Sequence, residues 1–255
     1  MNRLTEVFKT GKKDLLNIYC TAGYPQIEST AEVILALQKY GADMVEIGMP
    51  YSDPIADGPV IQESNKNALK NGMNLQLLFQ QLEQIKDSVH IPVILMGYIN
   101  PVLQFGIENF CIAAEKAGVS GVIIPDLPMH EYEEQYQKFF TSHQLSFIFL
   151  ITPGTTKKRI NKADELSNGF VYLVSSSSTT GQISKPLINP FFQSISKMNL
   201  KNPVMIGFGI KDKLTFKEAC TVANGAIIGS AYINALQNEK GIDENTKNFI
   251  ASLRD

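Results

Sequence analysis

Short, continuous apolar runs recur along the chain and alternate with longer amphipathic stretches. Continuous apolar runs are typical of strands that are buried on both faces of a parallel sheet. Eight of them occur, at Leu16–Cys20, Met44–Gly48, Val93–Gly97, Gly121–Pro125, Phe147–Ile151, Phe170–Val174, Pro203–Gly207 and Ala226–Ser230. Helical spacing of apolar residues marks the stretches between them, as at Ser29–Tyr40, Leu75–Ser88, Ile107–Ala117, Glu131–His143 and Asp212–Val222.

Glycine marks the junction between several predicted helices and the strands that follow. Gly41, Gly118, Gly169 and Gly225 each stand just past a helix, where glycine accepts the left-handed conformation that caps a helix C-terminus. Eight strands alternating with helices in 255 residues favour an α/β fold, a closed (β/α)8 TIM barrel, over an open sheet. We expect a single domain over residues 1–255, with residues 1–10 as an extra N-terminal helix at the barrel floor.

The interval after the second predicted strand is unusually long. The runs that begin at residues 44 and 93 are 49 residues apart, whereas the other strand starts are 23 to 33 residues apart. The extra length contains a loop with two aspartates, Asp53 and Asp57, among several prolines and a glycine. Because active sites of such barrels lie on the loops after the strands, we expect this loop on the functional face.

An acidic residue inside the second apolar run is the strongest candidate for chemistry. Glu46 lies between Val45 and Ile47, so in a strand it faces away from both and into the barrel. Burial raises the pKa of a carboxyl, which suits a group that both donates and accepts protons. The alternative is an acid that turns outward and pairs with a base. Asp53 and Asp57 have a structural alternative too, since Asp before Pro or Gly is common in turns.

Small residues gather after the last three predicted strands. Gly181 follows the sixth strand, Gly207 and Gly209 end the seventh in G-F-G-I, and Gly229 and Ser230 end the eighth. Small residues let backbone N–H groups approach an anion, and barrels of this class often bind phosphate after strands seven and eight. The alternative is that these glycines only end the strands and do not bind an anion. Other strand ends carry residues that could line a planar apolar substrate or pack in the core: Tyr19, Met96, Tyr98, Tyr172 and Phe208.

Composition and the remaining side chains narrow the function further. A net charge of −2 gives no support to a nucleic acid or a membrane surface as partner. The three cysteines have no metal or disulfide spacing, and neither a signal peptide nor a membrane-spanning run is found, so we expect a cytoplasmic protein. No lysine lies in the C-terminal half of a predicted strand, which disfavours a Schiff base. The three histidines, His90, His130 and His143, form no metal site.

These motifs together resemble those of the tryptophan synthase alpha subunit family, over essentially the whole chain. The matching segments are T-A-G-Y-P at 21–25, E-I-G-M-P-Y-S-D-P-I-A-D-G-P-V-I-Q at 46–62, Y-I-N-P at 98–101, D-L-P at 126–128, G-F-G-I at 207–210 and G-S-A at 229–231. The resemblance implies a barrel that cleaves indole-3-glycerol phosphate to indole and glyceraldehyde 3-phosphate in a retro-aldol reaction. It also implies that Glu46 is the acid–base, that Asp57 stabilises positive charge on the indole ring, and that Tyr172 lines the site.

Further expectations concern substrate contacts and partners. The resemblance implies no cofactor in this chain and a pyridoxal-phosphate beta subunit as the partner in an α2β2 assembly. The expected substrate contacts are Tyr19, Ile61, Met96, Tyr98, Thr180, Gly181, Gly207, Phe208, Gly209, Gly229 and Ser230. The expected contacts with the partner are Asp53, Pro54, Asn100, Pro101, Asp126 and Pro128.

The segment Ser175–Gly181 departs from the family pattern S-R-x-G-V-T-G. Serines at 176 and 178 replace the arginine and the first glycine, while Thr180 and Gly181 remain. The loss of arginine removes a charged hydrogen-bonding side chain, and the loss of glycine restricts the backbone. Two other functions therefore stay open. One is a mainly regulatory subunit that activates the beta enzyme, and the other is a stand-alone indole-releasing lyase.

Overall fold

A single parallel sheet forms the centre of the protein. The structure, a computed structural model, describes residues 2–174 and 190–254. Its strand segments are hydrogen-bonded in the order β5-β4-β3-β2-β1-β9-β8-β7-β6. They are β1 (Leu15–Thr21), β2 (Met44–Gly48), β3 (Val93–Met96), β4 (Gly121–Ile123), β5 (Ser146–Phe147), β6 (Leu150–Ile151), β7 (Val171–Val174), β8 (Val204–Gly207) and β9 (Gly225–Ile228).

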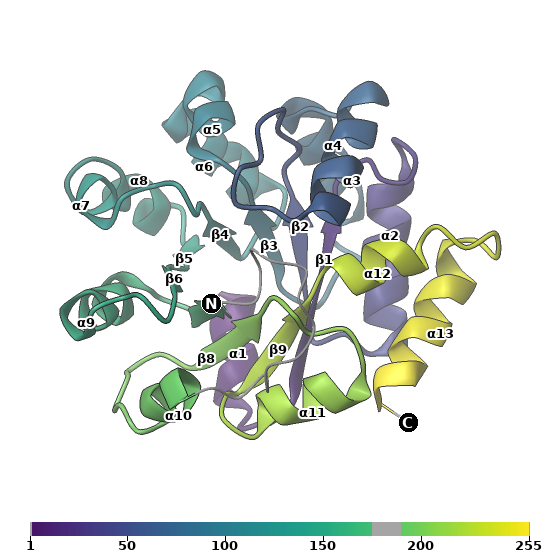
Figure 1. Ribbon diagram of the computed structural model, residues 1–255. Coiled ribbons are helices and arrows are strands. Elements are labelled where there is room, and N and C mark those ends of the chain that lie inside the picture. Colours follow the sequence, from purple (N-terminus) through teal and green to yellow (C-terminus); the bar gives the residue numbers. More distant parts are fainter. Residues whose placement is uncertain (1, 175–189, 255) are drawn as a thin grey trace.

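The two ends of this sheet are joined because β5 and β6 are parts of one strand. Between them, Ile148 donates its backbone N–H to Val122 of β4 (3.0 Å), and Phe149 accepts from Tyr172 of β7 (3.0 Å). The segment 146–151 therefore pairs with one end of the sheet on each side. The result is the predicted eight-stranded barrel, with helices around it (Figure 1).

Most helices lie where the amphipathic spacing predicts them. α2 has the predicted bounds, whereas the predicted helix Glu131–His143 is divided by a π-helical turn. No helix in the described residues is both long and apolar enough to cross a membrane. The helices are α1 (Arg3–Lys9), α2 (Ser29–Tyr40), α3 (Pro59–Lys70), α4 (Leu75–Ile85), α5 (Ile99–Phe105), α6 (Ile107–Lys116), α7 (Met129–Glu131), the π turn η1 (Tyr132–Tyr136), α8 (Gln137–Ser142), α9 (Lys157–Leu166), α10 (Pro190–Ser196), α11 (Lys213–Cys220), α12 (Ser230–Ala235) and α13 (Ile242–Arg254).

The long interval after β2 contains an additional helix, α3. This helix begins directly after the aspartate loop, with Gly58 as N-cap and Pro59 in its first turn, where proline's fixed φ and missing N–H do no harm. Two helices, α3 and α4, thus separate β2 from β3. The prolines and glycine of the loop fix where α3 starts, and α3 in turn holds the end of the loop.

The N-terminal helix α1 covers the barrel floor, as predicted. Leu4 is fully buried, and the Asn2 side chain donates to the backbone oxygens of Ser120 (2.6 Å) and Gln144 (2.7 Å). Both acceptors lie just before the N-terminal ends of β4 and β5. The opposite end of the barrel, where the strands end, is therefore the end left for function.

Two of the four predicted glycine caps are wrong. Gly41 (φ 99°) and Gly118 (φ 75°) have the left-handed conformation that ends a helix, but Gly169 and Gly225 do not have positive φ. A Cβ on Gly169 would lie 2.8 Å from Leu4 Cδ2, and one on Gly225 would lie 2.1 Å from the Leu15 carbonyl oxygen. These two glycines are required for close packing around the barrel floor.

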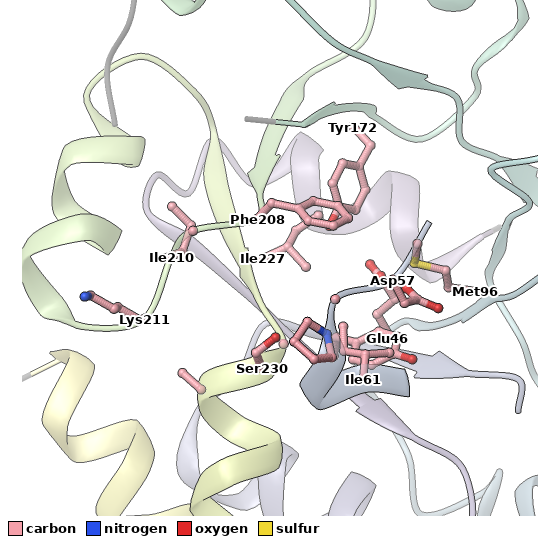
Figure 2. Close-up of a pocket in the computed structure, with 16 residues that line it drawn as sticks. Glu46, Asp57, Ile61, Met96, Tyr172, Phe208, Ile210, Lys211, Ile227 and Ser230 are labelled. Atoms are coloured by element: carbon pink, nitrogen blue, oxygen red, sulfur yellow. The ribbon is translucent and has the colours of Figure 1, made fainter. Parts of the chain in front are cut away.

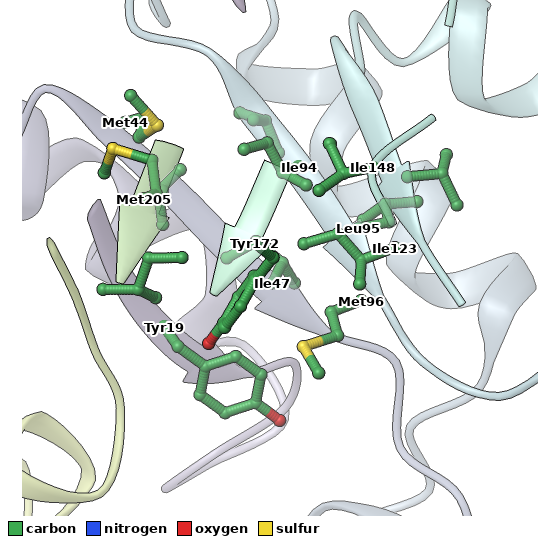
Figure 3. Packing of buried hydrophobic residues seen from close by; sticks show 14 of the residues in the cluster. Tyr19, Met44, Ile47, Ile94, Leu95, Met96, Ile123, Ile148, Tyr172 and Met205 are labelled. Carbon is green, nitrogen blue, oxygen red and sulfur yellow. The ribbon is translucent and has the colours of Figure 1, made fainter. Parts of the chain in front are cut away.

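The barrel interior is filled by side chains from alternate strand positions. Met44 and Met205 lie together toward one end, and Tyr19, Tyr172 and Met96 lie toward the other (Figure 3). All five are buried. The interior is therefore a packed core whose last layer, at the carboxyl ends of the strands, is made of two tyrosines and a methionine.

Candidate active site

A cavity of about 320 Å³ opens at the carboxyl ends of the strands. Its walls come from β1, β2, β3, β7 and β9, from the loops after β2 and β8, and from the first turns of α3 and α12 (Figure 2). The lining residues are Tyr19, Glu46, Asp57, Gly58, Pro59, Ile61, Met96, Tyr172, Phe208, Gly209, Ile210, Lys211, Ile227, Gly229, Ser230 and Ala231.

Glu46 is a buried carboxyl in the wall of this cavity. It is 1% exposed, and its neighbours Val45 and Ile47, which face the opposite way in the strand, are also fully buried. Its Oε2 accepts a hydrogen bond from Asn17 Nδ2 at 3.1 Å. Burial raises the pKa of Glu46 to about 8, the Asn17 bond opposes this rise, and the nearby charge of Asp57 adds to it.

Asp57 is the second carboxyl, held at the end of the loop after β2. Its Oδ2 accepts a hydrogen bond from the Tyr98 hydroxyl at 3.1 Å, and the same hydroxyl accepts one from the backbone N–H of Ala56 at 2.9 Å. Burial raises the pKa of Asp57 to about 6, and the Tyr98 bond opposes that rise. The loop is thereby tied to the residues that follow β3.

The two carboxyls differ in charge at neutral pH. With a pKa of about 8 for Glu46 and about 6 for Asp57, the first is mostly protonated at pH 7 and the second mostly ionised. Two carboxyls whose environments separate their pKa values are the usual arrangement of an acid beside an anionic group. The cavity thus offers a proton donor and a negative charge in one place.

Tyr19 and Tyr172 each lie over a glycine of the next strand. A Cβ on Gly48 would lie 2.0 Å from Tyr19 Oη, and one on Gly207 would lie 2.1 Å from Tyr172 Oη. In the sheet, Tyr19 pairs with Glu46 and Tyr172 pairs with Met205. Gly48 and Gly207 each lie two residues after the pairing partner of their tyrosine. Burial raises the pKa of both tyrosines well above the usual value, so both hydroxyls remain neutral.

Small residues and one lysine form the other end of the cavity. After β8 the backbone turns sharply, with positive φ at Phe208 (66°) and at Gly209 (77°), a conformation that is rare for an aromatic residue. Gly229 and Ser230 begin α12 beside this turn. Lys211, which is exposed, stands at the rim.

The structure brings ten of the predicted site residues into the cavity wall. They are Tyr19, Glu46, Asp57, Ile61, Met96, Tyr172, Phe208, Gly209, Gly229 and Ser230. Tyr98 and Gly207 lie behind that wall, where Tyr98 contacts Asp57 and Gly207 contacts Tyr172. Thr180 and Gly181, with the rest of the segment Ser175–Gly181, lie outside the described residues.

Sequence reasoning missed Asn17 and Lys211. Asn17 is a polar residue in an otherwise apolar run, the same signal that identified Glu46. Lys211 directly follows G-F-G-I, where a cation would complement an anion site.

Comparison with known proteins gives the family of this chain. A sequence profile described as tryptophan synthase alpha chain matches residues 6–254. The tryptophan synthase alpha chain of Flavobacterium psychrophilum is 51% identical over 255 residues, covering 99% of this chain and 100% of the relative. That of Bacteroides fragilis is 50% identical over 242 residues, covering 94% and 92%. This chain belongs to the tryptophan synthase alpha chain family.

Solved structures of tryptophan synthases have the same fold. A crystal structure of the alpha chain from Legionella pneumophila has a TM-score of 0.89 and 33% identity, covering 100% of this chain and 96% of the other. A chain of the M. tuberculosis tryptophan synthase in its aminoacrylate-bound form has a TM-score of 0.86 and 29% identity, covering 99% and 98%. Membership of the tryptophan synthase alpha chain family makes this chain a lyase of tryptophan biosynthesis that acts on indole-3-glycerol phosphate.

The residues expected to contact a partner subunit lie on the loops after β2 and β4 and in the first turn of α5. Asp53, Asn100, Asp126 and Pro128 are exposed, and Pro54 and Pro101 are half-buried. Hydrogen bonds join these three segments, because Asp126 accepts from the Ile99 N–H (3.0 Å) and the Asn100 side chain donates to the Tyr51 hydroxyl (3.2 Å). These segments thus form one connected edge beside the cavity.

A metal site is not found in residues 2–174 and 190–254. No three side chains of histidine, cysteine, aspartate or glutamate there lie close enough to bind one ion.

Proposed function

We propose that Glu46 transfers the protons in the cleavage of indole-3-glycerol phosphate and that Asp57 stabilises the charge that develops on the ring. The observation that carries this proposal is the pair of carboxyls in one cavity wall with pKa values of about 8 and about 6. The cavity that contains both carboxyls also has apolar walls for an indole ring and small residues for a phosphate.

The reaction requires a proton to be given and another to be taken. The bond from indole C3 to the glycerol chain breaks with its electrons going to the ring only after C3 is protonated. The neighbouring hydroxyl on the chain then loses its proton as it becomes the aldehyde. A protonated Glu46 gives the first proton, and the carboxylate so formed accepts the second. Glu46 ends the cycle protonated, which agrees with its raised pKa.

Asp57 supplies the complementary negative charge. Protonation of C3 makes the ring a cation whose charge is shared with the ring N–H. An ionised carboxylate that accepts a hydrogen bond from that N–H stabilises the cation more than the neutral substrate, which is the requirement for acceleration. The hydrogen bond from Tyr98 keeps Asp57 ionised and oriented.

The phosphate would lie at the end formed by Gly209, Gly229 and Ser230. Small residues leave the backbone N–H groups open to an anion, and binding a remote phosphate orients the reacting carbon atoms. Thr180, Gly181 and Gly207 remain proposed contributors to this end. The exposed Lys211 at the rim would add a positive charge.

A pyridoxal-phosphate beta subunit would receive the indole, with the cofactor in that partner and an α2β2 assembly in the cytoplasm. The connected edge described above supports such a partner, since it presents Ile55 with 85% of its surface exposed. One exposed apolar side chain is ordinary on a protein surface, so the support lies in the position of Ile55 directly after Asp53 and Pro54, which are expected to contact the partner.

Indole release by the isolated chain tests the proposal. Glu46→Gln keeps the shape of the side chain and removes its proton transfer, so we expect cleavage to fall at least about 1,000-fold with an unchanged circular dichroism spectrum. Asp57→Asn should retain the fold and lose most of the activity. Near-normal cleavage by Glu46→Gln would refute the assignment. Repeating the assay with the beta subunit separates a catalytic chain from a mainly regulatory one.

A further inference from the structure

Asn17 on β1 is a buried amide in contact with Glu46. It is fully buried, does not line the cavity, and lies one interior position below Tyr19 on the same strand. Its Nδ2 donates to Glu46 Oε2 at 3.1 Å. Uncompensated burial of an amide is unfavourable, so this position is a costly place for an asparagine with a purely structural role.

The hydrogen bonds of this pair are incomplete in a specific way. Among the described residues, Glu46 Oε1 and Asn17 Oδ1 are buried atoms without a hydrogen-bond partner. One carboxyl oxygen is therefore fixed by Asn17, and the other has no partner on a side chain that lines the cavity. Asn65 and Gln81 also have a buried side-chain oxygen without a partner, so the distinguishing observation is that the Asn17 amide nitrogen donates to a carboxyl of the cavity wall.

We infer that Asn17 is a positioning residue for Glu46, whose amide fixes Oε2 and leaves Oε1 to face the reacting atoms of the substrate. This inference rests on the proposed role of Glu46. An amide suits the task because it carries both a donor and an acceptor. It donates through Nδ2 to the carboxylate, and after rotation of the amide Oδ1 can accept from the carboxylic acid.

Asn17 is also the group that opposes the effect of burial on Glu46. The titratable groups that interact electrostatically with Glu46 are Tyr19 and Cys20 from β1, Asp57 from the loop after β2, and Tyr172 from β7. None of these carries a positive charge, and β3 pairs with Glu46 through Ile94. The Asn17 hydrogen bond is thus the interaction that favours the ionised form of Glu46.

The test replaces Asn17 by leucine, which has a similar size and no polar atoms. We expect the pH profile of kcat for indole release to move upward by about one pH unit on its alkaline side. At the optimum, kcat should fall about tenfold, because Oε1 is less well oriented, with little change in KM. Asn17→Val is the alternative if the leucine variant does not fold.

The matched control is Asn245→Leu. Asn245 is also a buried asparagine, on α13, and its side chain donates to the Asn238 backbone oxygen (2.8 Å). It should lower stability without moving the pH profile. A wild-type profile and kcat for the Asn17 variants, or the same changes in Asn245→Leu, would overturn the inference. The proposed function fails separately, if Glu46→Gln remains active.

Discussion

The Tyr98 hydroxyl donates a hydrogen bond to Asp57 Oδ2 at 3.1 Å while it accepts one from Ala56 at 2.9 Å. A single side chain after β3 therefore holds both the carboxylate and the backbone of the loop after β2. The Tyr51 ring packs on it, with 5.3 Å between ring centroids. The geometry of Asp57 depends on this contact between neighbouring loops.

Replacing Tyr98 by phenylalanine should weaken the anionic role of Asp57. Because the Tyr98 bond opposes the rise in the pKa of Asp57, its loss should move the acidic limb of the kcat profile upward, from about 6 toward 7. We expect kcat at pH 7 to fall about twofold, because the ionised fraction of Asp57 then falls from about nine-tenths toward about one half. The control is Tyr51→Phe, which removes a neighbouring hydroxyl that accepts from Asn100. An acidic limb that stays in place in Tyr98→Phe would show that Tyr98 does not act on Asp57.

Stability should depend on pH through Glu46. Its carboxyl ionises near 4.5 in the unfolded chain and near 8 in the folded one. Below both values the two states bind the proton equally. Between them the folded chain binds one proton more, so stability falls as pH rises, and above about 8 the loss is complete. Glu46→Gln lacks this dependence.

Urea unfolding at pH 6.5 and pH 8.5 compares the wild type with Glu46→Gln. At pH 6.5 Asp57, whose pKa is about 6, is already largely ionised. The wild type should lose about 2 kcal/mol more stability than Glu46→Gln over this interval. The exposed Glu63 provides the control, as Glu63→Gln should behave like the wild type. Equal losses in wild type and Glu46→Gln would contradict a buried, protonated Glu46.

The sequence pattern predicted the barrel because each strand is apolar on both faces and each helix on one. Glu46 and Asp57 were predictable for the same reason, as acids where apolar or turn residues are expected. Asn17 shows the same contrast within Leu16–Cys20, but an asparagine alone does not indicate which carboxyl it contacts. That contact depends on the register of β1 against β2, which places Tyr19 beside Glu46, and register is not encoded in either strand alone.

The glycines show more clearly what local sequence cannot predict. Gly169 and Gly225 follow helices in the sequence just as Gly41 and Gly118 do, yet only the latter two adopt the left-handed conformation. The other two are small because Leu4 and Leu15 approach them. Close approach of distant segments is a property of the packed barrel, so local sequence cannot separate the two roles of glycine.

Gly207→Ala should displace Tyr172 from the cavity wall. The new Cβ would lie 2.1 Å from the hydroxyl oxygen, 2.4 Å from Cζ and 2.5 Å from Cε1, so the ring itself must move. Overpacking of this kind costs about 1–3 kcal/mol, and KM should rise as the wall shifts. Thermal unfolding and steady-state assays measure both effects. Gly154→Ala is the control, since the nearest atom to its Cβ would be 3.9 Å away, and it should be nearly neutral. An unchanged melting temperature in Gly207→Ala would refute the contact.

Lys211→Met should weaken substrate binding without slowing the chemical step. Lys211 stands at the rim of the cavity beyond Gly209, far along the wall from Glu46 in Figure 2, so a charge there acts on the phosphate end and not on the reacting carbon atoms. The exposed position limits the effect to about 1 kcal/mol, which corresponds to a rise in KM of about fivefold with kcat unchanged.

Added salt should reduce the difference in KM between the wild type and Lys211→Met, because screening weakens the attraction of the Lys211 charge for the phosphate, and the variant lacks that charge. Lys217→Met on α11 removes an exposed lysine that does not line the cavity and should leave KM as it is. If both variants raise KM equally, the effect comes from the overall charge of the protein and Lys211 has no specific role at the phosphate end.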